Sequence, residues 1–207
     1  MAAKVTGGHM GVPARRHEAP AASGSPAPAG GRALVITVSD GVAAGIRRDL
    51  SGDGLARRLE GLGFATDRAV VPDERSDIEH LLAAQAASHV LILTTGGTGL
   101  TPRDVTPQAT RATVEYEVPG LPELMRAQGG RSTPNAYLSR SVAGVLKQCL
   151  VVNLPGSPRG AMDSLAALEL VLDHALATLA GPFDHDSGTG DRSDGSAAAG
   201  RTNSTNS

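Results

Sequence analysis

The segment from Thr94 to Thr110, TTGGTGLTPRDVTPQAT, places an acid a few residues after a glycine-rich loop. Gly96, Gly97 and Gly99 allow the backbone to take positive φ angles and to approach a ligand closely. Successive amides in such a loop can point at an anion, as in phosphate-binding nests. Because Asp104 could hold a cation beside that anion, the segment predicts a phosphoryl-transfer site.

Two better-known phosphate-binding motifs do not fit this loop. No lysine follows the glycines, although a P-loop requires one. Pro102 stands where a dinucleotide fingerprint would place its third glycine. A tight turn without any ligand remains an equally good interpretation of a bare Gly-Gly-Thr-Gly sequence.

A second acid, Asp73 in Pro-Asp-Glu, adds a hard oxygen donor to that of Asp104. Mg²⁺ is typically held by one or two carboxylates together with substrate phosphates and waters, so the two acids predict a Mg²⁺–triphosphate site. Each acid has a structural alternative. Asp73 could cap the helix that follows it. Asp104 could have a purely structural role, either pairing with Arg103 or capping the turn at Thr106.

Four more polar residues are weaker candidates. Arg103 could bind phosphate through two parallel hydrogen bonds, or be solvated. Ser157 precedes the last predicted helix, whose first amides favour an anion, but it could equally be a plain cap. Asp40 and Asp49 are as compatible with turns or caps as with a site.

Alternating apolar runs predict the elements that would position these residues. Strands are expected over 33–38, 64–71 and 89–93, and helices over 51–62 and 75–87. Ser51 is the candidate cap of the first helix, and Gly63 is its candidate stop. This alternation predicts right-handed crossovers and a mainly parallel sheet.

The second half of the chain is less regular. A short helix is expected over 121–127, and 141–146 with 149–153 could form a hairpin or adjoining strands. Leucines that recur every three or four residues predict one long amphipathic helix over 159–180.

Four polar segments fall at the expected carboxyl ends of strands: Ser39-Asp40, Pro72-Asp73-Glu74, the loop at Gly96, and Asn153-Leu154-Pro155-Gly156. Ligands of open α/β sheets bind beyond those ends. The segments are therefore expected to converge on a single site.

The ends of the 207-residue chain differ from its middle. Residues 1–31, rich in Ala, Gly and Pro, and residues 182–207, rich in Gly, Ser, Asp and Asn, lack any hydrophobic period and are expected to be disordered. Residues 32–181 are expected to form one domain of ordinary size.

Composition excludes several classes of protein. A net charge of −2 and an aromatic content of 2% argue against nucleic-acid binding, and the pairs Arg47-Arg48 and Arg57-Arg58 are interpreted as solvated charge. No apolar stretch reaches the roughly 20 residues of a membrane span, and no secretory signal is recognisable. Cys149 is the single cysteine, which excludes an internal disulfide and predicts a buried small hydrophobe. A cytoplasmic location is expected.

The chain resembles the Mog/MoaB family of molybdenum cofactor biosynthesis proteins. The core pattern of that family, TTGGTG followed by a variable pair and RDVTP, is present as Thr94–Pro107. Five other segments resemble family segments in the right order: Ile36–Asp40, Asp49–Gly52, Val71–Glu74, Leu138–Arg140 and Asn153–Pro158. The resemblance extends over about Arg32 to Gly181.

The resemblance implies a three-layer α/β/α sandwich that is commonly trimeric and sometimes hexameric. It implies that molybdopterin is adenylylated at its terminal phosphate by Mg²⁺–ATP, and that another protein later inserts molybdate. Asp73 and Asp104 match the family's catalytic acids and would hold Mg²⁺. The residues expected to bind substrate are Ser39, Asp40, Thr95, Gly96, Gly97, Thr98, Gly99, Arg103, Asn153, Pro155, Gly156 and Ser157.

Two other functions remain open at this point. Some MoaB-type relatives lack the Arg-Asp pair after the glycine loop and bind without catalysing, which would make the chain a scaffold. A related domain could also act on another nucleotide or pterin. The presence of Asp73, Arg103 and Asp104 in this chain favours the enzyme.

Overall fold

The computed structural model describes residues 31–181. The segments expected to be disordered, 1–31 and 182–207, lie outside the described residues apart from Gly31. The elements, in chain order, are β1 (Arg32–Val38), α1 (Asp40–Ala43), α2 (Leu50–Gly61), β2 (Ala65–Val71), α3 (Arg75–Gln85), β3 (Leu91–Thr95), α4 (Thr106–Thr113), β4 (Tyr116–Glu117), α5 (Gly120–Gly130), the 3₁₀ helix η1 (Pro134–Leu138), β5 (Ala143–Leu146), β6 (Cys149–Leu154), α6 (Pro158–Leu168) and α7 (Leu172–Ala180).

A six-stranded sheet runs in the order β2-β1-β3-β6-β5-β4. The strands β2, β1, β3 and β6 are mutually parallel, whereas β5 and β4 add an antiparallel edge. The mainly parallel sheet is thus confirmed. Of the two arrangements open for 141–153, the structure adopts the hairpin, whose turn places Lys147 at φ +59°.

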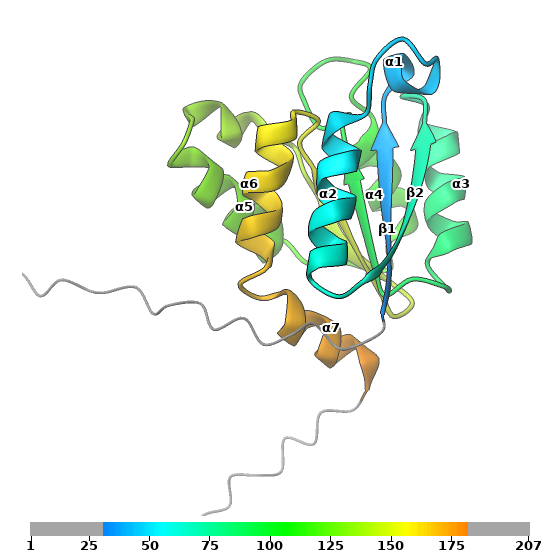
Figure 1. Ribbon diagram of the computed structural model, residues 1–207, viewed down its shortest axis with the longest axis vertical. Helices are drawn as coiled ribbons and strands as arrows, with labels where there is room; N and C mark the ends of the chain where they lie inside the picture. The colour runs from blue at the N-terminus through cyan, green and yellow to red at the C-terminus, as the bar shows by residue number, and fades with distance from the viewer. Residues whose placement is uncertain (1–30, 182–207) are drawn as a thin grey trace, which may run out of the picture.

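Helices cover both faces of the sheet, as the three-layer prediction requires. Ala33 and Val35 of β1 pack in the cluster that includes α2, α5, α6 and α7, while Leu34 and Ile36 point the other way, into the cluster that includes α3 and α4. Figure 1 shows α2 and α6 on one side of the strands and α3 on the other. Because β1 is buried on both faces, its sequence is continuously apolar.

Cys149 lies in β6 and is fully buried, as predicted. Burial raises the pKa of its thiol to about 12. Within residues 31–181, no helix has both the length and the hydropathy needed to cross a membrane.

The predicted cap of α2 is wrong by two residues. Asp49, not Ser51, is the cap, because its Oδ1 accepts a hydrogen bond of 2.9 Å from the Gly52 amide. Ser51 lies inside the first turn and is buried. The predicted stop is confirmed, since Gly63 follows the helix at φ +93°.

The single long helix predicted over 159–180 is also wrong, because the chain breaks it into α6 and α7. Glu169 ends α6 and binds Arg58 of α2 through two hydrogen bonds of 2.7 and 2.5 Å. Leu165 and Leu172 nevertheless pack in the same core cluster. The leucine spacing therefore reported the buried face correctly but not the change of axis.

Candidate functional site

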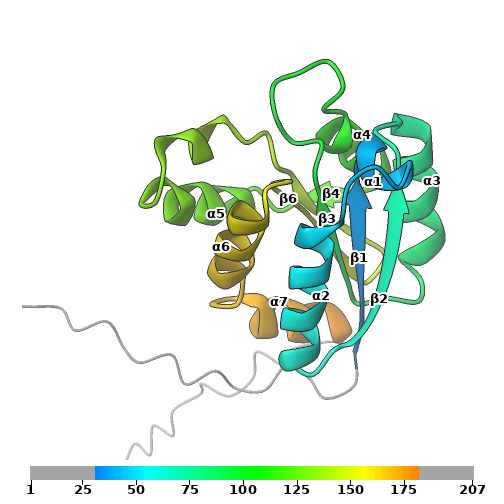
Figure 2. The same ribbon diagram turned by 45° about the horizontal axis from the view of Figure 1, so that its top comes forward.

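The four polar segments do converge at one edge of the sheet. Because β1, β2, β3 and β6 are parallel, their carboxyl ends lie together, and Figure 2 shows α1 and the loop after β3 rising above the arrowheads. The Ser39 amide donates to Val71 O at 3.0 Å, which joins the ends of β1 and β2. The Gly96 amide donates to Leu154 O at 3.2 Å, which joins β3 to β6.

Glycine is required at the first two positions of the loop. Gly96 has φ +106° and Gly97 has φ +63°. A Cβ on Gly96 would lie 2.2 Å from Val38 O, and one on Gly97 would lie 2.3 Å from Thr106 Oγ1. Thr106, which is fully buried, donates a hydrogen bond of 2.9 Å to Gly96 O. The loop is thus held between β1 and the start of α4.

The two candidate acids flank the same loop. A Cβ on Gly97 would lie 3.3 Å from Asp73 Oδ1, and one on Gly99 would lie 3.0 Å from Asp104 Oδ2. The chain brings together two carboxylates that are 31 positions apart in the sequence. Because these glycines carry no side chains, both carboxylates can lie close against the loop backbone.

Asp73 is held by Asp40 through a reciprocal pair of hydrogen bonds. The Asp40 amide donates to Asp73 Oδ2 at 2.9 Å, and the Asp73 amide donates to Asp40 Oδ1 at 3.0 Å. The cap position of α3 belongs to Glu74, which makes no capping hydrogen bond with its side chain. The alternative role of Asp73 as a helix cap is therefore excluded.

Arg103 bridges two other acids of the site edge. Its Nη2 donates to Asp40 Oδ2 at 2.7 Å and its Nη1 to Glu74 Oε1 at 2.9 Å. The hydrogen bond from Arg103, together with that from the Asp73 amide, lowers the pKa of Asp40. The same two acids raise the pKa of Arg103. The alternative pairing of Arg103 with Asp104 does not occur.

Asp104 accepts two hydrogen bonds from Thr101, one of 2.8 Å from the amide and one of 2.6 Å from the hydroxyl. Burial raises the pKa of Asp104, but these bonds, the Gly99 amide and the positive charge of Arg140 outweigh it and leave the pKa below its usual value. Asp104 is therefore ionised at neutral pH. It does not cap the turn at Thr106, because the cap position of α4 belongs to Val105.

Arg140 is a site residue that the motif analysis did not select. Its amide donates to Thr98 O at 3.0 Å, its Nε donates to Gly99 O at 2.6 Å, and its Nη2 donates to Asp104 O. One residue thus holds both ends of the segment that carries Asp104. The resemblance had indicated the segment Leu138–Arg140, but nothing in its composition pointed to this role.

The turn at Pro155, Gly156 and Ser157 packs directly on the glycine loop. Thr95 Oγ1 donates to Pro155 O at 2.8 Å, and a Cβ on Gly156 would lie 3.1 Å from the Cα of Gly96. Ser157 Oγ accepts from the Gly160 amide at 3.2 Å and so caps α6. Capping leaves the Ser157 hydroxyl proton available for a ligand.

Asn153 supports the site from below. It is fully buried, and its Nδ2 donates to Thr94 Oγ1 at 3.0 Å and to Thr110 Oγ1 at 2.8 Å. Its Oδ1 accepts from the Val142 amide at 3.3 Å. These bonds tie β6 to β3 and α4. Thr98, only 5% exposed, also lies under the loop surface.

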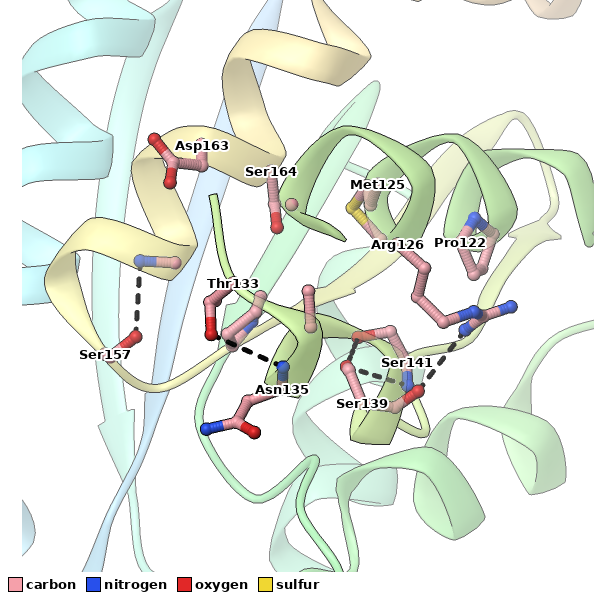
Figure 3. A pocket seen from close by; sticks show the side chains of 14 residues that line it. Pro122, Met125, Arg126, Thr133, Asn135, Ser139, Ser141, Ser157, Asp163 and Ser164 are labelled. Carbon is pink, nitrogen blue, oxygen red and sulfur yellow. Dashed lines mark hydrogen bonds between the residues drawn. The ribbon is translucent and has the colours of Figure 1, made fainter. Parts of the chain in front are cut away.

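Two pockets lie on either side of the Pro155–Ser157 turn. The first, here called the α5–α6 pocket, has a volume of about 180 Å³ and includes Arg126, Thr133, Asn135, Ser139, Ser141, Ser157 and Ser164 in its lining. Figure 3 shows these polar side chains around it. The second, the β1–α2 pocket, has a volume of about 240 Å³ and includes Ser39, Arg47, Arg48, Asp49, Ser51, Thr95 and Gly156.

Comparison with known proteins agrees with this geometry. The family model described as "probable molybdopterin binding domain" matches residues 34–175. The chain belongs to this Mog/MoaB family. A molybdopterin adenylyltransferase of Helicobacter pylori is 34% identical, over 72% of this chain and 88% of the relative.

The solved structure of the molybdopterin biosynthesis enzyme MoaB from Thermus thermophilus is 48% identical, with a TM-score of 0.66, and the match covers 73% of this chain and 98% of that one. A molybdenum cofactor biosynthesis bifunctional protein of Synechococcus elongatus is 42% identical over 87% of this chain. The match covers only 57% of that longer relative.

The acids of this Mog/MoaB domain suit a Mg²⁺ ion that also binds the phosphates of a substrate. Within residues 31–181, no three His, Cys, Asp or Glu side chains gather to hold a metal ion alone. Asp73 Oδ1 faces Gly97 and accepts no hydrogen bond from the described residues. A carboxylate oxygen in this position, with a second carboxylate on the same loop, matches Mg²⁺ that arrives with phosphates and retains waters.

Proposed function

We propose that the protein is a molybdopterin adenylyltransferase of molybdenum cofactor biosynthesis. The observation that carries this proposal is the placement of two carboxylates, Asp73 and Asp104, on either side of a backbone cradle of glycines. Relatives named molybdopterin adenylyltransferase support it. The reaction transfers AMP from Mg²⁺–ATP to the terminal phosphate of molybdopterin.

The chemistry needs positioning rather than covalent help from the protein. An oxygen of the terminal phosphate of molybdopterin attacks the α-phosphorus of ATP, and a new P–O bond forms. The bond from the α-phosphorus to the bridging oxygen breaks, and pyrophosphate leaves with its electron pair. When bound, Mg²⁺ would neutralise phosphate charge; Asp73 and Asp104 would hold it, and the amides of Gly97 and Thr98 would orient the phosphates.

The two pockets suit the two substrates. The hydroxyl and amide groups of Thr133, Asn135, Ser141 and Ser164 line the α5–α6 pocket and match the donors and acceptors along the edge of a pterin. The β1–α2 pocket would take the nucleotide. The reacting phosphates would then meet over the Pro155–Ser157 turn, beside the glycine loop.

The test is to incubate the purified chain with molybdopterin and Mg²⁺–ATP and to measure adenylylated molybdopterin and pyrophosphate. We expect product from the native chain and about 100-fold less from Asp104→Asn, which keeps the size of the side chain but removes its charge. Tight molybdopterin binding without product would instead support the binding-only scaffold.

The assembly proposed for the family is a homotrimer, with a hexamer as the alternative. Tyr116, Tyr137 and Leu138 are 55, 62 and 54% exposed in the single chain, and large apolar side chains on a surface favour association. Light scattering should give three times the 21.0 kDa chain mass. A monomer at all concentrations would contradict the proposal.

The product is proposed to pass to a molybdate-insertion protein in the cytoplasm.

A further inference from the structure

Arg47 and Arg48 stand apart from the other arginines of the described chain. Within residues 31–181, neither guanidinium makes a hydrogen bond or an ion pair. Arg131 shares this property but lines neither pocket, whereas Arg47 and Arg48 both line the β1–α2 pocket. Two unpaired positive charges therefore border one cavity.

The backbone that carries these arginines is fixed although their guanidinium groups are not. The amides of Ile46 and Arg47 both donate to Gly41 O at 2.9 Å, and the Leu50 amide donates to Arg48 O at 3.1 Å. A Cβ on Gly41 would lie 2.8 Å from Arg47 Nε. The Arg47 side chain thus lies against α1 at Gly41.

The carboxylate in the same pocket is already paired with Arg68, which also binds Asp53 at 2.5 Å. Asp49 Oδ2 accepts from Arg68 at 2.5 Å and from Thr37 at 2.8 Å, while its Oδ1 accepts from the Gly52 amide at 2.9 Å. Because Asp49 is engaged, the charge that the pocket offers to a ligand is positive. Ser39 and Ser51 add hydroxyl protons that none of the described residues accepts.

We propose that the β1–α2 pocket binds a phosphate anion, and that Arg47 and Arg48 hold the β- and γ-phosphates of ATP and then the leaving pyrophosphate. The nucleotide assignment rests on the adenylyl transfer proposed above. Guanidinium groups match phosphate oxygens through paired hydrogen bonds. Charge builds on the leaving group as the bond to the α-phosphorus breaks, so these contacts strengthen in the transition state.

The place of the pocket in the site agrees with this assignment. Ser39 lines the pocket, and Asp40, the next residue, holds Asp73. Gly156 borders the pocket and packs on Gly96. A triphosphate with its α-phosphorus at the glycine loop would therefore have its tail toward the arginines. The sequence pair that was interpreted as solvated charge becomes a substrate-binding pair.

Calorimetric titration with pyrophosphate tests the pocket without turnover. We expect pyrophosphate to bind the native chain and to bind Arg47→Gln/Arg48→Gln about 10-fold or more weakly. The matched control Arg57→Gln/Arg111→Gln removes the same charge from exposed positions outside both pockets, and we expect it to stay within about twofold of native. Equal affinity of native chain and Arg47/Arg48 variant would overturn the proposal.

Two controls accompany this test: a conservative variant separates charge from hydrogen-bond geometry, and thermal unfolding shows whether the variants are folded. Arg47→Lys/Arg48→Lys keeps the charge but loses the paired hydrogen bonds, so intermediate affinity is expected. Both side chains are exposed, so we expect thermal unfolding of all variants to match the native chain. Affinity that follows net charge alone, equally reduced in the Arg57/Arg111 control, would also overturn the proposal.

Steady-state kinetics separate the sources of the phosphate. We expect Arg47→Gln/Arg48→Gln to raise KM for ATP about 10-fold and to lower kcat, because the lost contacts are strongest in the transition state. Inhibition by pyrophosphate should weaken, and KM for molybdopterin should stay unchanged. A raised KM for molybdopterin alone would show that the arginines bind the phosphate of the pterin. Arginine-dependent pyrophosphate binding by a chain that makes no adenylylated product would contradict the proposed function while supporting the phosphate site.

Discussion

The two ends of the central sheet carry similar clusters of charge but differ in what surrounds them. At the amino end, Asp67 binds Arg32 at 2.6 Å and His89 at 3.0 Å. At the carboxyl end, Asp40 binds Arg103 at 2.7 Å. Hydrogen bonds from these arginines lower the pKa of both acids. By charge pairing and pKa alone, the two ends cannot be told apart.

The difference lies in the backbone and in the pockets. At the carboxyl end, Gly96 packs against the backbone of Val38, and the next glycines of the same loop, Gly97 and Gly99, face the carboxylates of Asp73 and Asp104. Within residues 31–181, the amino end has no such loop. The α5–α6 and β1–α2 pockets both open at the carboxyl end, where Pro155, Gly156 and Ser157 contribute to their linings. The ion pair of Asp40 and Arg103 lies beside these pockets and not in their linings. Because both ends carry an ion pair with a shifted pKa, such a pair does not distinguish them; the close-packed glycine loop and the pockets beside it do.

The largest expected effect comes from comparing one glycine at each end. Gly96→Ala would place a methyl 2.2 Å from Val38 O at φ +106°, whereas Gly63 has φ +93° and no atom within 4 Å of its missing Cβ. We expect Gly96→Ala to lower the free energy of unfolding by more than about 3 kcal/mol, and Gly63→Ala by only about 1 kcal/mol. Urea unfolding measures both. Equal losses would mean that backbone conformation, not the close approach, makes glycine necessary.

The next effect compares one acid at each end. Asp73→Asn should lower kcat/KM for adenylyl transfer about 100-fold, because it removes a charge from the proposed Mg²⁺ site. Asp67→Asn removes the same charge from the amino end and should leave kcat/KM within about twofold of native. Initial rates at varied Mg²⁺ decide between them. A matching loss in both variants would place the effect in global folding rather than in the site.

A third comparison sets Arg140 against Arg32. We expect Arg140→Gln to cost about 2 kcal/mol of unfolding free energy, because it leaves loop carbonyls without charged donors. It should also move the acid limb of the pH–rate profile to higher pH, because Arg140 helps to lower the pKa of Asp104. Arg32→Gln removes an exposed ion pair, 58% exposed at the arginine, and should cost under about 1 kcal/mol with no shift of the profile. An unshifted profile in Arg140→Gln would restrict this residue to a structural role.

The smallest expected effect is the acid dependence of stability. Asp40 and Asp67 both have folded-state pKa values below the ordinary 3.8. Their stabilising contribution is therefore complete above about pH 4 and is lost as the pH falls through the lowered values. Asp40→Asn and Asp67→Asn should each reduce the fall in urea midpoint below pH 4. Salt at 0.5 M should do the same for the native chain, because it shortens the screening length to about 5 Å and weakens exposed ion pairs. An undiminished fall in both variants would assign the acid dependence to other carboxylates.

The sequence predicted the sheet and the convergence of its loops because apolar periodicity and strand direction depend on local pattern. It missed α4, whose buried residues include Thr106, Pro107 and Thr110, since a helix that buries hydroxyls has no apolar stripe. It missed the break between α6 and α7 because the leucine spacing continues across it, and leucines on both sides pack in one core cluster.

Within the site, residue types predicted the acids and the glycines but not their partners. Nothing in the spacing indicated that Asp40 would hold Asp73, or that Arg103 would pair with Asp40 and Glu74 rather than with Asp104. Arg140 escaped notice for the same reason, because its partners are backbone carbonyls that carry no sequence signal.

The contact between Gly96 and Gly156 has a consequence for how the chain can evolve. The missing Cβ of Gly156 lies only 3.1 Å from the Cα of Gly96, and the missing Cβ of Gly96 lies 2.2 Å from Val38 O. A side chain at position 156 would therefore press on a loop that cannot yield toward β1. Across descendants of this sequence we expect position 156 to remain glycine wherever Gly96 is retained.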